Sequence, residues 1–159
     1  MLPQACGGEK HYQRTLARVA ELHPIYQPYV INLINTAYEE LKMAWVITDG
    51  YRSPAEQNAL SSANTKAKGL NIYHQYGLAI DIHSVRNGKI TFLSSDTQAI
   101  EDNKLIGPIG KRLGLEWGGD WKRFKDYPHF QLIPNGKTWK ILKPQLLKIG
   151  VQNYKKLTF

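Results

Sequence analysis

Two short segments, residues 73–81 and 126–131, carry side chains that can bind one metal ion together, and this constrains the fold more than any other feature. The first segment contains His74 and Asp81, and the second contains Asp126 and His129. Catalytic zinc typically takes three protein ligands, among them histidine and carboxylate side chains, and leaves its fourth position open. We therefore expect the fold to bring His74, Asp81 and His129 around one Zn²⁺ ion, with Asp126 beside it as a base for water.

The backbone around these residues suits such a site. Gly77 lets the chain bend between His74 and the expected strand that contains Asp81, and Pro128 fixes the backbone just before His129. The short spacing from residue 126 to residue 129 can place a carboxylate near the metal while the imidazole binds it directly.

Other histidines and acids could take the same roles. His83 lies two residues after Asp81, on the same face of the expected strand, and remains an alternative ligand. Glu116 and Asp120 are near enough in sequence to compete with Asp126 as the base. The remaining two histidines lie on or beside the first expected helix without an acidic partner at ligand spacing, and we expect them to be structural or solvated: His11 and His23.

The order of the expected elements predicts an α+β fold. Apolar periodicity and capping signals predict helices over residues 11–22, 28–42, 54–64 and 95–113, with Gly107-Pro108 kinking or dividing the last one. Strands are expected over residues 44–48, 77–85, 90–93 and 129–133. Residues 137–159 are ambiguous, and a strand together with a short helix is the interpretation considered. We expect one catalytic domain over residues 1–159, with a small, mainly antiparallel sheet flanked by helices and the zinc site in a central cleft.

The positive charge is concentrated in the last quarter of the chain. The net charge is +8, and residues 1–121 contain 12 basic and 12 acidic side chains. Residues 122–159 contain nine basic side chains and one acid, Asp126. Such a surface attracts acidic polymers or anionic membranes, or is simply a solvated face that keeps the protein soluble. It contains no patterned recognition motif for nucleic acid, so nucleic-acid binding is not expected.

The single cysteine, Cys6, excludes an internal disulfide and the zinc motifs that need two cysteines. We expect an inert thiol near a loose terminus. A lipid-anchored cysteine is the alternative, although no basic and apolar leader precedes it. No apolar run approaches the roughly 20 residues that a membrane span requires, and no signal peptide is recognisable in the chain as given.

Together with two further motifs, these residues resemble a known family, the zinc peptidases that cleave peptidoglycan stem peptides. It includes D-alanyl-D-alanine carboxypeptidases and L-alanyl-D-glutamate endopeptidases, and is related in fold to hedgehog signalling domains. The family pattern, His-x6-Asp followed by Asp/Glu-x2-His, is present as His74–Asp81 and Asp126–His129. Residues 50–57 (GYRSPAEQ) resemble its arginine motif, and residues 115–121 (LEWGGDW) resemble its tryptophan-glycine segment. The resemblance covers residues 44–132 and does not extend to residues 1–25 or 137–159.

The resemblance implies roles for the polar residues of the site. Asp126 would accept a proton from water and pass it to the leaving amine. Arg52 would stabilise the carbonyl oxygen or bind a substrate carboxylate; its alternative role is an ion pair with Asp49 or Glu56. Further candidate substrate contacts are Gln57, Trp121 and Tyr127. Gln57 could equally be an exposed helix residue, and Trp117 is expected in the core rather than in the cleft.

Two positions differ from many members of the family. Ile72 stands where many members carry serine, and the base position holds Asp126 where the carboxypeptidases more often carry glutamate. With aspartate at the base position, the chain resembles the endolysin-type endopeptidases of bacteriophages.

We therefore expect a monomeric, zinc-dependent hydrolase of bacterial peptidoglycan. The leading hypothesis is an L-alanyl-D-glutamate endopeptidase that acts as a phage or phage-derived endolysin. It would be made in the bacterial cytoplasm, act on the cell wall, and dock on an acidic wall polymer or anionic membrane through the basic residues 122–159. The alternatives are a D,D- or L,D-carboxypeptidase and a zinc-containing binding module without catalysis.

Overall fold

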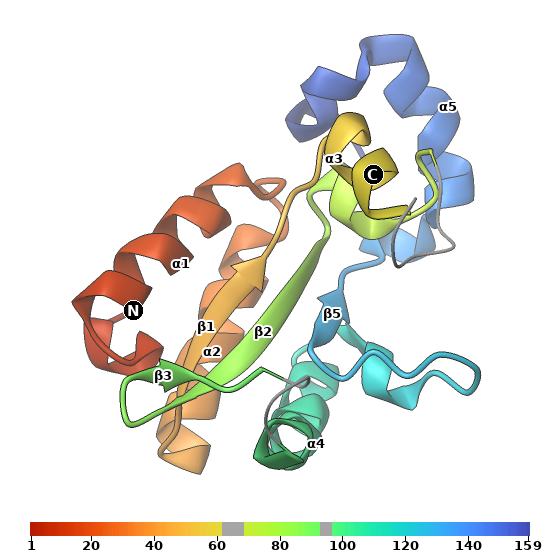
Figure 1. Cartoon of the computed structure of the whole chain (residues 1–159). Coiled ribbons are helices and arrows are strands. Elements are labelled where there is room, and N and C mark those ends of the chain that lie inside the picture. The colour runs from red at the N-terminus through yellow and green to blue at the C-terminus, as the bar shows by residue number, and fades with distance from the viewer. Residues whose placement is uncertain (62–68, 93–96) are drawn as a thin grey trace.

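The computed structural model describes residues 1–61, 69–92 and 97–159 of the chain. Its centre is an antiparallel sheet with strand order β1-β2-β5-β4, in which β3 also pairs with β2 (Figure 1). The strands are β1 (Ala44–Asp49), β2 (Ala79–Arg86), β3 (Lys89–Ile90), β4 (Glu116–Trp117) and β5 (His129–Gln131). The expected α+β class with a small antiparallel sheet is confirmed.

Helices surround this sheet. They are α1 (Glu9–Glu21), α2 (Gln27–Leu41), α3 (Pro54–Ser61), α4 (Thr97–Arg112) and α5 (Trp139–Ile149), with 3-10 turns at Pro3–Cys6, Tyr73–Tyr76, Gly118–Asp120, Pro134–Gly136 and Val151–Lys156. In Figure 1, α1 and α2 lie along β1, α4 lies at one end of the molecule, and α5 and α3 lie at the other. No helix in the described ranges has the length and apolarity to cross a membrane.

Alternation along β2 and β5 separates the core from the polar face of the sheet. Ile80, Ile82 and Phe130 are fully buried in the hydrophobic core. Gly110 of α4 allows the helix to approach this face, because a Cβ atom there would lie 2.2 Å from the Phe130 ring. Since neighbouring strand residues point to opposite faces, Asp81 lies on the other side of the sheet. The apolar pattern thus fixes where the polar site lies.

Most expected elements are present, with boundaries shifted by one to three residues. The capping box of α3 is formed: the Ser53 backbone N–H donates to Glu56 Oε2 (2.7 Å), and the Glu56 N–H donates to Ser53 Oγ (3.2 Å). The expected division of the 95–113 helix is wrong, because α4 continues through Pro108. The preceding residue, Gly107, packs closely against the Trp117 ring, since a Cβ atom at Gly107 would lie 2.6 Å from that ring. We infer that this contact keeps α4 continuous at Pro108.

The last part of the chain is helical. Residues 139–149 form α5 and residues 151–156 form a 3-10 turn, so the strand considered for residues 137–159 is not formed. Leu142 and Leu146 are fully buried, one helical turn apart, and anchor α5 on the core. Pro144 lies between them on the exposed side of the helix.

The expectation of a loose N-terminus around Cys6 is wrong. Cys6 is fully buried within a 3-10 turn and belongs to the core cluster. Burial raises the pKa of its thiol to about 11, which agrees with an inert thiol. The strand expected over residues 90–93 is shorter, since β3 ends at Ile90. Two expectations lie outside the described residues: the end of the third helix near residue 64 and the cap at residue 95.

Candidate metal centre

Strand pairing places the carboxylate of Asp81 between two other polar residues. Asp81 pairs with His129 across β2 and β5, and with Asp49 across β1 and β2. Directly opposed residues in antiparallel strands project to the same face with Cβ atoms about 4.5–5.5 Å apart. The register therefore brings the Asp81 and His129 side chains together although 48 positions separate them in sequence.

His74 reaches the same point from the 3-10 turn that precedes β2. The turn ends at Gly77, whose φ of 67° lies in the left-handed region. A Cβ atom at Gly77 would also lie 2.6 Å from the backbone nitrogen of His23, which donates its N–H to the Gly77 carbonyl. Gly77 thus ends the turn so that the His74 ring faces β2, as expected from the sequence.

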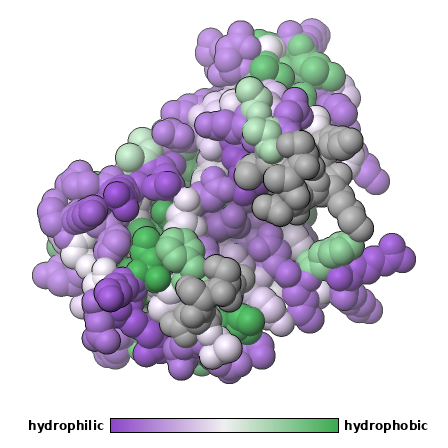
Figure 2. Space-filling view, in the orientation of Figure 1, coloured by the Kyte–Doolittle hydropathy of each residue, from purple (hydrophilic) through white to green (hydrophobic). Residues whose placement is uncertain are grey.

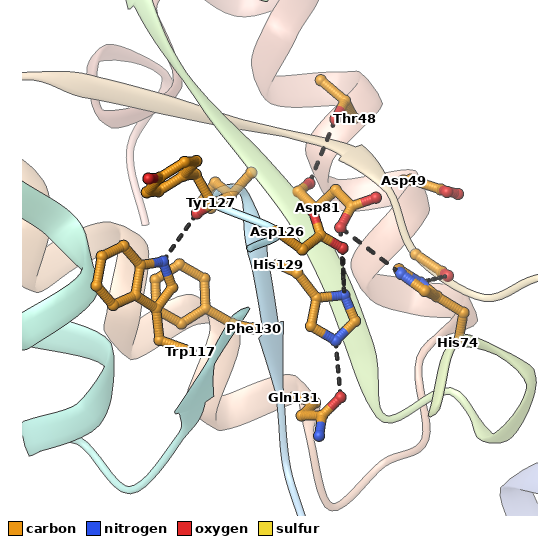
Figure 3. A network of polar contacts seen from close by, with 12 residues as sticks. Thr48, Asp49, His74, Asp81, Trp117, Asp126, Tyr127, His129, Phe130 and Gln131 are labelled. Carbon is orange, nitrogen blue, oxygen red and sulfur yellow. Dashed lines mark hydrogen bonds and ion pairs between the residues drawn. The ribbon is translucent and has the colours of Figure 1, made fainter. Parts of the chain in front are cut away.

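Three ligand atoms converge at this point (Figure 3). Asp81 Oδ1 lies 3.6 Å from His74 Nε2 and 3.4 Å from His129 Nδ1, and all three atoms lie within 4.8 Å of one another. Tetrahedral zinc with bonds of about 2.1 Å requires ligand atoms about 3.4 Å apart. The two contacts of Asp81 therefore already have nearly the spacing that one zinc ion needs.

Each histidine is held in the tautomer that metal binding requires. His74 Nδ1 is 2.7 Å from the carbonyl oxygen of Gly50, and His129 Nε2 is 2.7 Å from Oε1 of Gln131. Because both oxygens accept hydrogen bonds, these ring nitrogens carry a proton, and the other nitrogen of each ring, which faces Asp81, is the one that can bind a metal ion. Such outer contacts orient histidine ligands in metal sites.

The charges and unsatisfied atoms of this cluster also fit a cation. Asp81 Oδ1 and His129 Nδ1 are buried and have no hydrogen-bond partner in the part of the chain that the structure describes. Leaving buried polar atoms unpaired is costly, whereas a bound cation would satisfy both. Burial alone would raise the pKa of Asp81, but His74 and His129 hold it well below its ordinary value of 3.8. The carboxylate is thus kept ionised, as a metal ligand must be.

Asp126 lies beside this cluster, at the opening of the site. Its Oδ2 is 3.7 Å from His129 Nδ1, and its side chain is 45% exposed. The Asp126 N–H donates to the Gly118 carbonyl (3.0 Å), and a Cβ atom at Gly118 would lie 2.4 Å from the Asp126 carbonyl oxygen. Burial, followed by the negative charge of Asp81, raises the pKa of Asp126 above its ordinary value. A carboxylate with a raised pKa is a stronger proton acceptor when ionised.

Arg52 forms the ion pair with Asp49 that the sequence analysis gave as an alternative, and it also lies beside the metal cluster. Its Nε donates to Asp49 Oδ2 (2.6 Å), NH2 also pairs with Asp49, and NH1 donates to Gln57 Oε1 (3.0 Å). NH2 also lies 3.5 Å from Asp81 Oδ2. Gln57 is fully buried, so the alternative of an exposed helix residue is wrong. Arg52 therefore faces the metal cluster in a fixed orientation, with Asp49 and Gln57 holding its guanidinium group.

An open pocket of about 360 Å³ lies over the cluster. Asp126, Arg52, His74 and His129 line one part of it, and Trp121 forms a wall with its ring centroid 5.0 Å from that of His129. The remaining lining residues are Asn71, Ile72, Tyr73, Gln131 and Trp139. The pocket therefore combines the candidate metal ligands and other polar side chains with three aromatic residues, Tyr73, Trp121 and Trp139.

The two other aromatic residues considered in the sequence pack together elsewhere. Trp117 is buried in the core, as expected, and its Nε1 donates to the Tyr127 carbonyl oxygen (2.8 Å). The Tyr127 ring packs near Trp117 rather than lining the pocket, and Figure 3 shows it turned away from His74. A substrate contact by Tyr127 has no support from this arrangement.

The competing candidates from the sequence have other partners. His83 shares the face of Asp81 but contacts Thr48, with 2.9 Å between Nδ1 and Oγ1. Glu116 accepts a hydrogen bond from Trp121 Nε1 (3.1 Å), and Asp120 pairs with Lys111 (2.9 Å). The metal-binding group found among the described residues consists only of His74, Asp81 and His129. The two other histidines contact backbone oxygens: His23 that of Leu157 (3.0 Å), and His11 that of Gly88 (2.9 Å).

Comparison with known proteins agrees with this geometry. The family model described as D-alanyl-D-alanine carboxypeptidase matches residues 65–132. Peptidoglycan L-alanyl-D-glutamate endopeptidase CwlK of Bacillus subtilis (strain 168) is 37% identical, over 80% of this chain and 84% of its own length. The chain belongs to this family of peptidoglycan peptidases. By this membership it is a metallopeptidase.

Other relatives agree with this assignment. The L-alanyl-D-glutamate peptidase of Listeria phage A118 is 27% identical over 79% of this chain and 43% of its own length. Among solved structures, the L-Ala D-Glu endopeptidase ChiX of Serratia marcescens has a TM-score of 0.61 at 24% identity, over 75% of this chain and 86% of its own. The D,D-pentapeptidase VanY of a VanB-type resistance cassette, solved with Zn(II), has a TM-score of 0.54 at 15% identity, over 84% and 83%. These two structures show that the fold is shared.

Sequence reasoning missed two residues of the site. Gln131 follows His129 by two positions on β5, and period-two alternation could have identified it as a neighbour on the same face. Trp139 begins α5, in a segment whose structure the sequence left ambiguous, so no local signal placed it in the pocket.

Proposed function

We propose that the chain is a zinc-dependent L-alanyl-D-glutamate endopeptidase of peptidoglycan, with His74, Asp81 and His129 as the metal ligands. The observation that supports it most is the convergence of three ligand atoms, two of them buried without a hydrogen-bond partner in the described chain. The likeness to CwlK, which covers most of both chains, supports the bond that is cut.

Asp126 is the proposed general base and then general acid. When bound, zinc acts as a Lewis acid that acidifies water and polarises a carbonyl group. Asp126, at the edge of the ligand cluster and open to the pocket, accepts the proton of the attacking water. It then delivers this proton to the leaving amine. Its position on the loop before β5 keeps it close to the ligands without making it one of them.

Arg52 is proposed to donate a hydrogen bond to the oxygen on which negative charge develops. Asp49 and Gln57 fix its guanidinium group, so little rotational freedom is lost when it meets that oxygen. Gln57 is fully buried and acts here through Arg52 rather than on the substrate. Trp121 is proposed to hold the substrate against the metal cluster as an aromatic wall.

The second candidate is a D-alanyl-D-alanine carboxypeptidase, because that is the description of the family model that matches residues 65–132. Incubation with intact sacculi and with free pentapeptide, followed by mass analysis, separates the two by the new termini. The endopeptidase produces a new amino terminus on glutamate, whereas the carboxypeptidase releases alanine. Release of alanine alone would contradict the endopeptidase proposal.

The catalytic role of Asp126 is tested by Asp126→Asn. We expect turnover to fall by about 10²–10⁴-fold, the usual contribution of a general base, while the zinc content is unchanged. Equal loss of zinc and activity would instead make Asp126 a ligand. An Asp126→Asn variant that digests peptidoglycan at the parent rate would contradict the proposed catalytic role of Asp126.

The basic residues 122–159 are proposed to dock the enzyme on an acidic wall polymer or an anionic membrane surface. None of their nine basic side chains forms an ion pair with a carboxylate in the described ranges, so their charge is not neutralised internally. The end of the molecule formed by α5 mixes hydrophilic and hydrophobic surface (Figure 2), and Ile141 and Leu147 of α5 are exposed. Sedimentation with purified walls, with and without their acidic polymer, and with anionic vesicles would test this.

Three further proposals concern the setting of the enzyme. We propose that it is monomeric, that it is made in the bacterial cytoplasm, and that it reaches the wall as a phage or phage-derived endolysin. The likeness to the peptidase of Listeria phage A118 supports the last point. Light scattering of the purified protein and cell fractionation before and after lysis would check them.

A further inference from the structure

We propose that Lys143 and Asn71 form a subsite for a free carboxylate of the stem peptide, on the side of the scissile bond that leaves as the amine. This inference rests on the proposed endopeptidase function and adds a specificity determinant from α5, outside the segment that matches the family model.

A hydrogen bond joins the two side chains, and through Asn71 it links Lys143 to the pocket. Asn71 lines the pocket, and Lys143 Nζ donates to Asn71 Oδ1 at 3.2 Å. This bond orients the amide so that the NH2 group of Asn71 points away from the lysine. The amide and the ammonium group then still offer hydrogen-bond donors, and a carboxylate can accept from both.

The wall beside this pair is fixed in position. Trp139 lines the pocket, and its backbone N–H donates to the Tyr73 hydroxyl at 3.2 Å. Trp139 is the first residue of α5, so the positive end of the helix dipole lies on the pocket side. Lys143 follows one turn later on the same helix. The field of the helix end and the charge of Lys143 therefore both favour an anion here.

The positive charge of Lys143 is available, unlike that of Arg52. Within the described ranges Lys143 has no carboxylate partner, and its side chain is half-buried. Arg52 already pairs with Asp49 and lies 3.5 Å from Asp81. A substrate carboxylate beside Arg52 would add a third negative charge there, whereas beside Lys143 it would meet an uncompensated cation.

The distance to the metal cluster limits which carboxylate can bind. Asn71 precedes His74 by three residues, so their Cα atoms lie within about 11 Å, the length of up to three extended residues. Glutamate has two carboxyl groups and only one continues the peptide, so a glutamate directly after the scissile bond keeps one free carboxylate. The carboxyl terminus of a short stem peptide carries the same chemical group. The free glutamate carboxylate and the carboxyl terminus of a short stem peptide are therefore both candidates for the subsite at this distance from the metal cluster.

The test compares kcat and KM on three synthetic stem peptides. One has both carboxylates, one has the free glutamate carboxylate replaced by a carboxamide, and one has a carboxamide at its carboxyl terminus. We expect Lys143→Met to lower kcat/KM by about tenfold or more on the first peptide, mainly through KM, as the loss of a charge-assisted hydrogen bond does. The loss should disappear on the amidated peptide that lacks the bound carboxylate, and this arm identifies the source.

Two variants control the test. Lys10→Met removes a charge from an exposed position of α1, outside the proposed docking residues, and should leave kcat/KM unchanged on all three peptides. Asn71→Asp places a negative charge in the subsite. It should raise KM more for the peptides that keep the bound carboxylate than for the peptide in which that carboxylate is a carboxamide. An equal effect of Lys143→Met on all peptides, or none, would overturn the subsite alone. A parent protein that cleaves none of them before glutamate would overturn the endopeptidase proposal, and the subsite with it.

Discussion

Two carboxylates near opposite ends of β2 differ in how their oxygens are used. Asp102 of α4 is fully buried and accepts hydrogen bonds from Ser84 Oγ (2.7 Å), from Arg86 through Nε and NH2 (both 2.8 Å), and from Gln98 Nε2 (3.1 Å). Asp81, in contrast, has a buried Oδ1 without a hydrogen-bond partner in the described chain. The protein supplies hydrogen-bond donors to both oxygens of Asp102, whereas Oδ1 of Asp81 remains available to bind a metal ion.

This difference shows how the fold separates stability from function. The Asp102 network ties α4 to β2 with bonds that the protein supplies completely. The Asp81 cluster is positioned by outer contacts, such as the His129–Gln131 bond, while Asp81 Oδ1 and His129 Nδ1 have no hydrogen-bond partner among the described residues. Matched Asp→Asn changes at the two places should therefore have opposite consequences for activity and stability.

The largest effect is expected for Asp81→Asn. The amide lacks the negative charge that binds a dication, so zinc binding and peptidoglycan hydrolysis should both fall below detection. The far-ultraviolet circular dichroism spectrum should remain that of the parent, since Oδ1 holds no hydrogen bond in the described chain. Zinc content by mass spectrometry and turnover on sacculi measure this. Full activity with bound zinc would contradict the assignment of Asp81.

Asp102→Asn should show the reverse pattern. The change removes the ion pair between the buried carboxylate of Asp102 and the exposed side chain of Arg86. We expect this to lower the free energy of unfolding by about 2–3 kcal/mol. Zinc content and kcat should be unchanged at temperatures where the variant is folded. Urea unfolding monitored by tryptophan fluorescence gives the free energy. A stability equal to that of the parent, or a selective loss of kcat, would break the comparison.

Gln131→Leu probes the outer contact of the metal cluster. Leucine leaves the Nε2–H of His129 without an acceptor, and such changes typically weaken metal affinity by about 10–100-fold. Gln131→Glu is the matched control, because a carboxylate still accepts this hydrogen bond. Competition with a chelator of known zinc affinity measures both variants. Equal affinities for the leucine variant and the parent would show that Gln131 does not orient His129.

The smallest effect is expected in the pH dependence of stability. Burial alone would raise the pKa of Asp102, but hydrogen bonds from Arg86, Ser84 and Gln98 lower it below the ordinary 3.8. A group with a lowered folded-state pKa contributes stability above its unfolded pKa and loses it as the pH falls through the folded value. The difference in unfolding free energy between the parent and Asp102→Asn should thus stay constant from pH 7 to about pH 5 and shrink below pH 3.8. A difference that widens at low pH would contradict this sign.

The sequence predicted the three converging metal ligands better than it predicted the residues around them. His74, Asp81 and His129 could be identified because their spacing matches a ligand pattern, and strand alternation places Asp81 on one defined face. Ser53 and Glu56 could be predicted as a cap because capping is a local interaction. Local patterns suffice where the interaction itself is local.

Features that depend on tertiary packing were missed. Gly107 and Pro108 suggested a break in α4, but the close contact of Gly107 with the Trp117 ring depends on residues that the local sequence does not bring together. Cys6 was placed at a loose terminus although it is buried in the core. The role of Trp139 depends on how α5 packs on the hydrophobic core, and Tyr127 packs near Trp117 instead of facing the pocket.

The most direct measurement is a crystal structure of the protein grown with zinc, with anomalous scattering recorded at the zinc absorption edge. We predict one peak per chain, at about 2.0–2.2 Å from His74 Nε2, Asp81 Oδ1 and His129 Nδ1. A peak beside His83, or no peak within bonding distance of these three atoms at saturating zinc, would contradict the proposed metal centre.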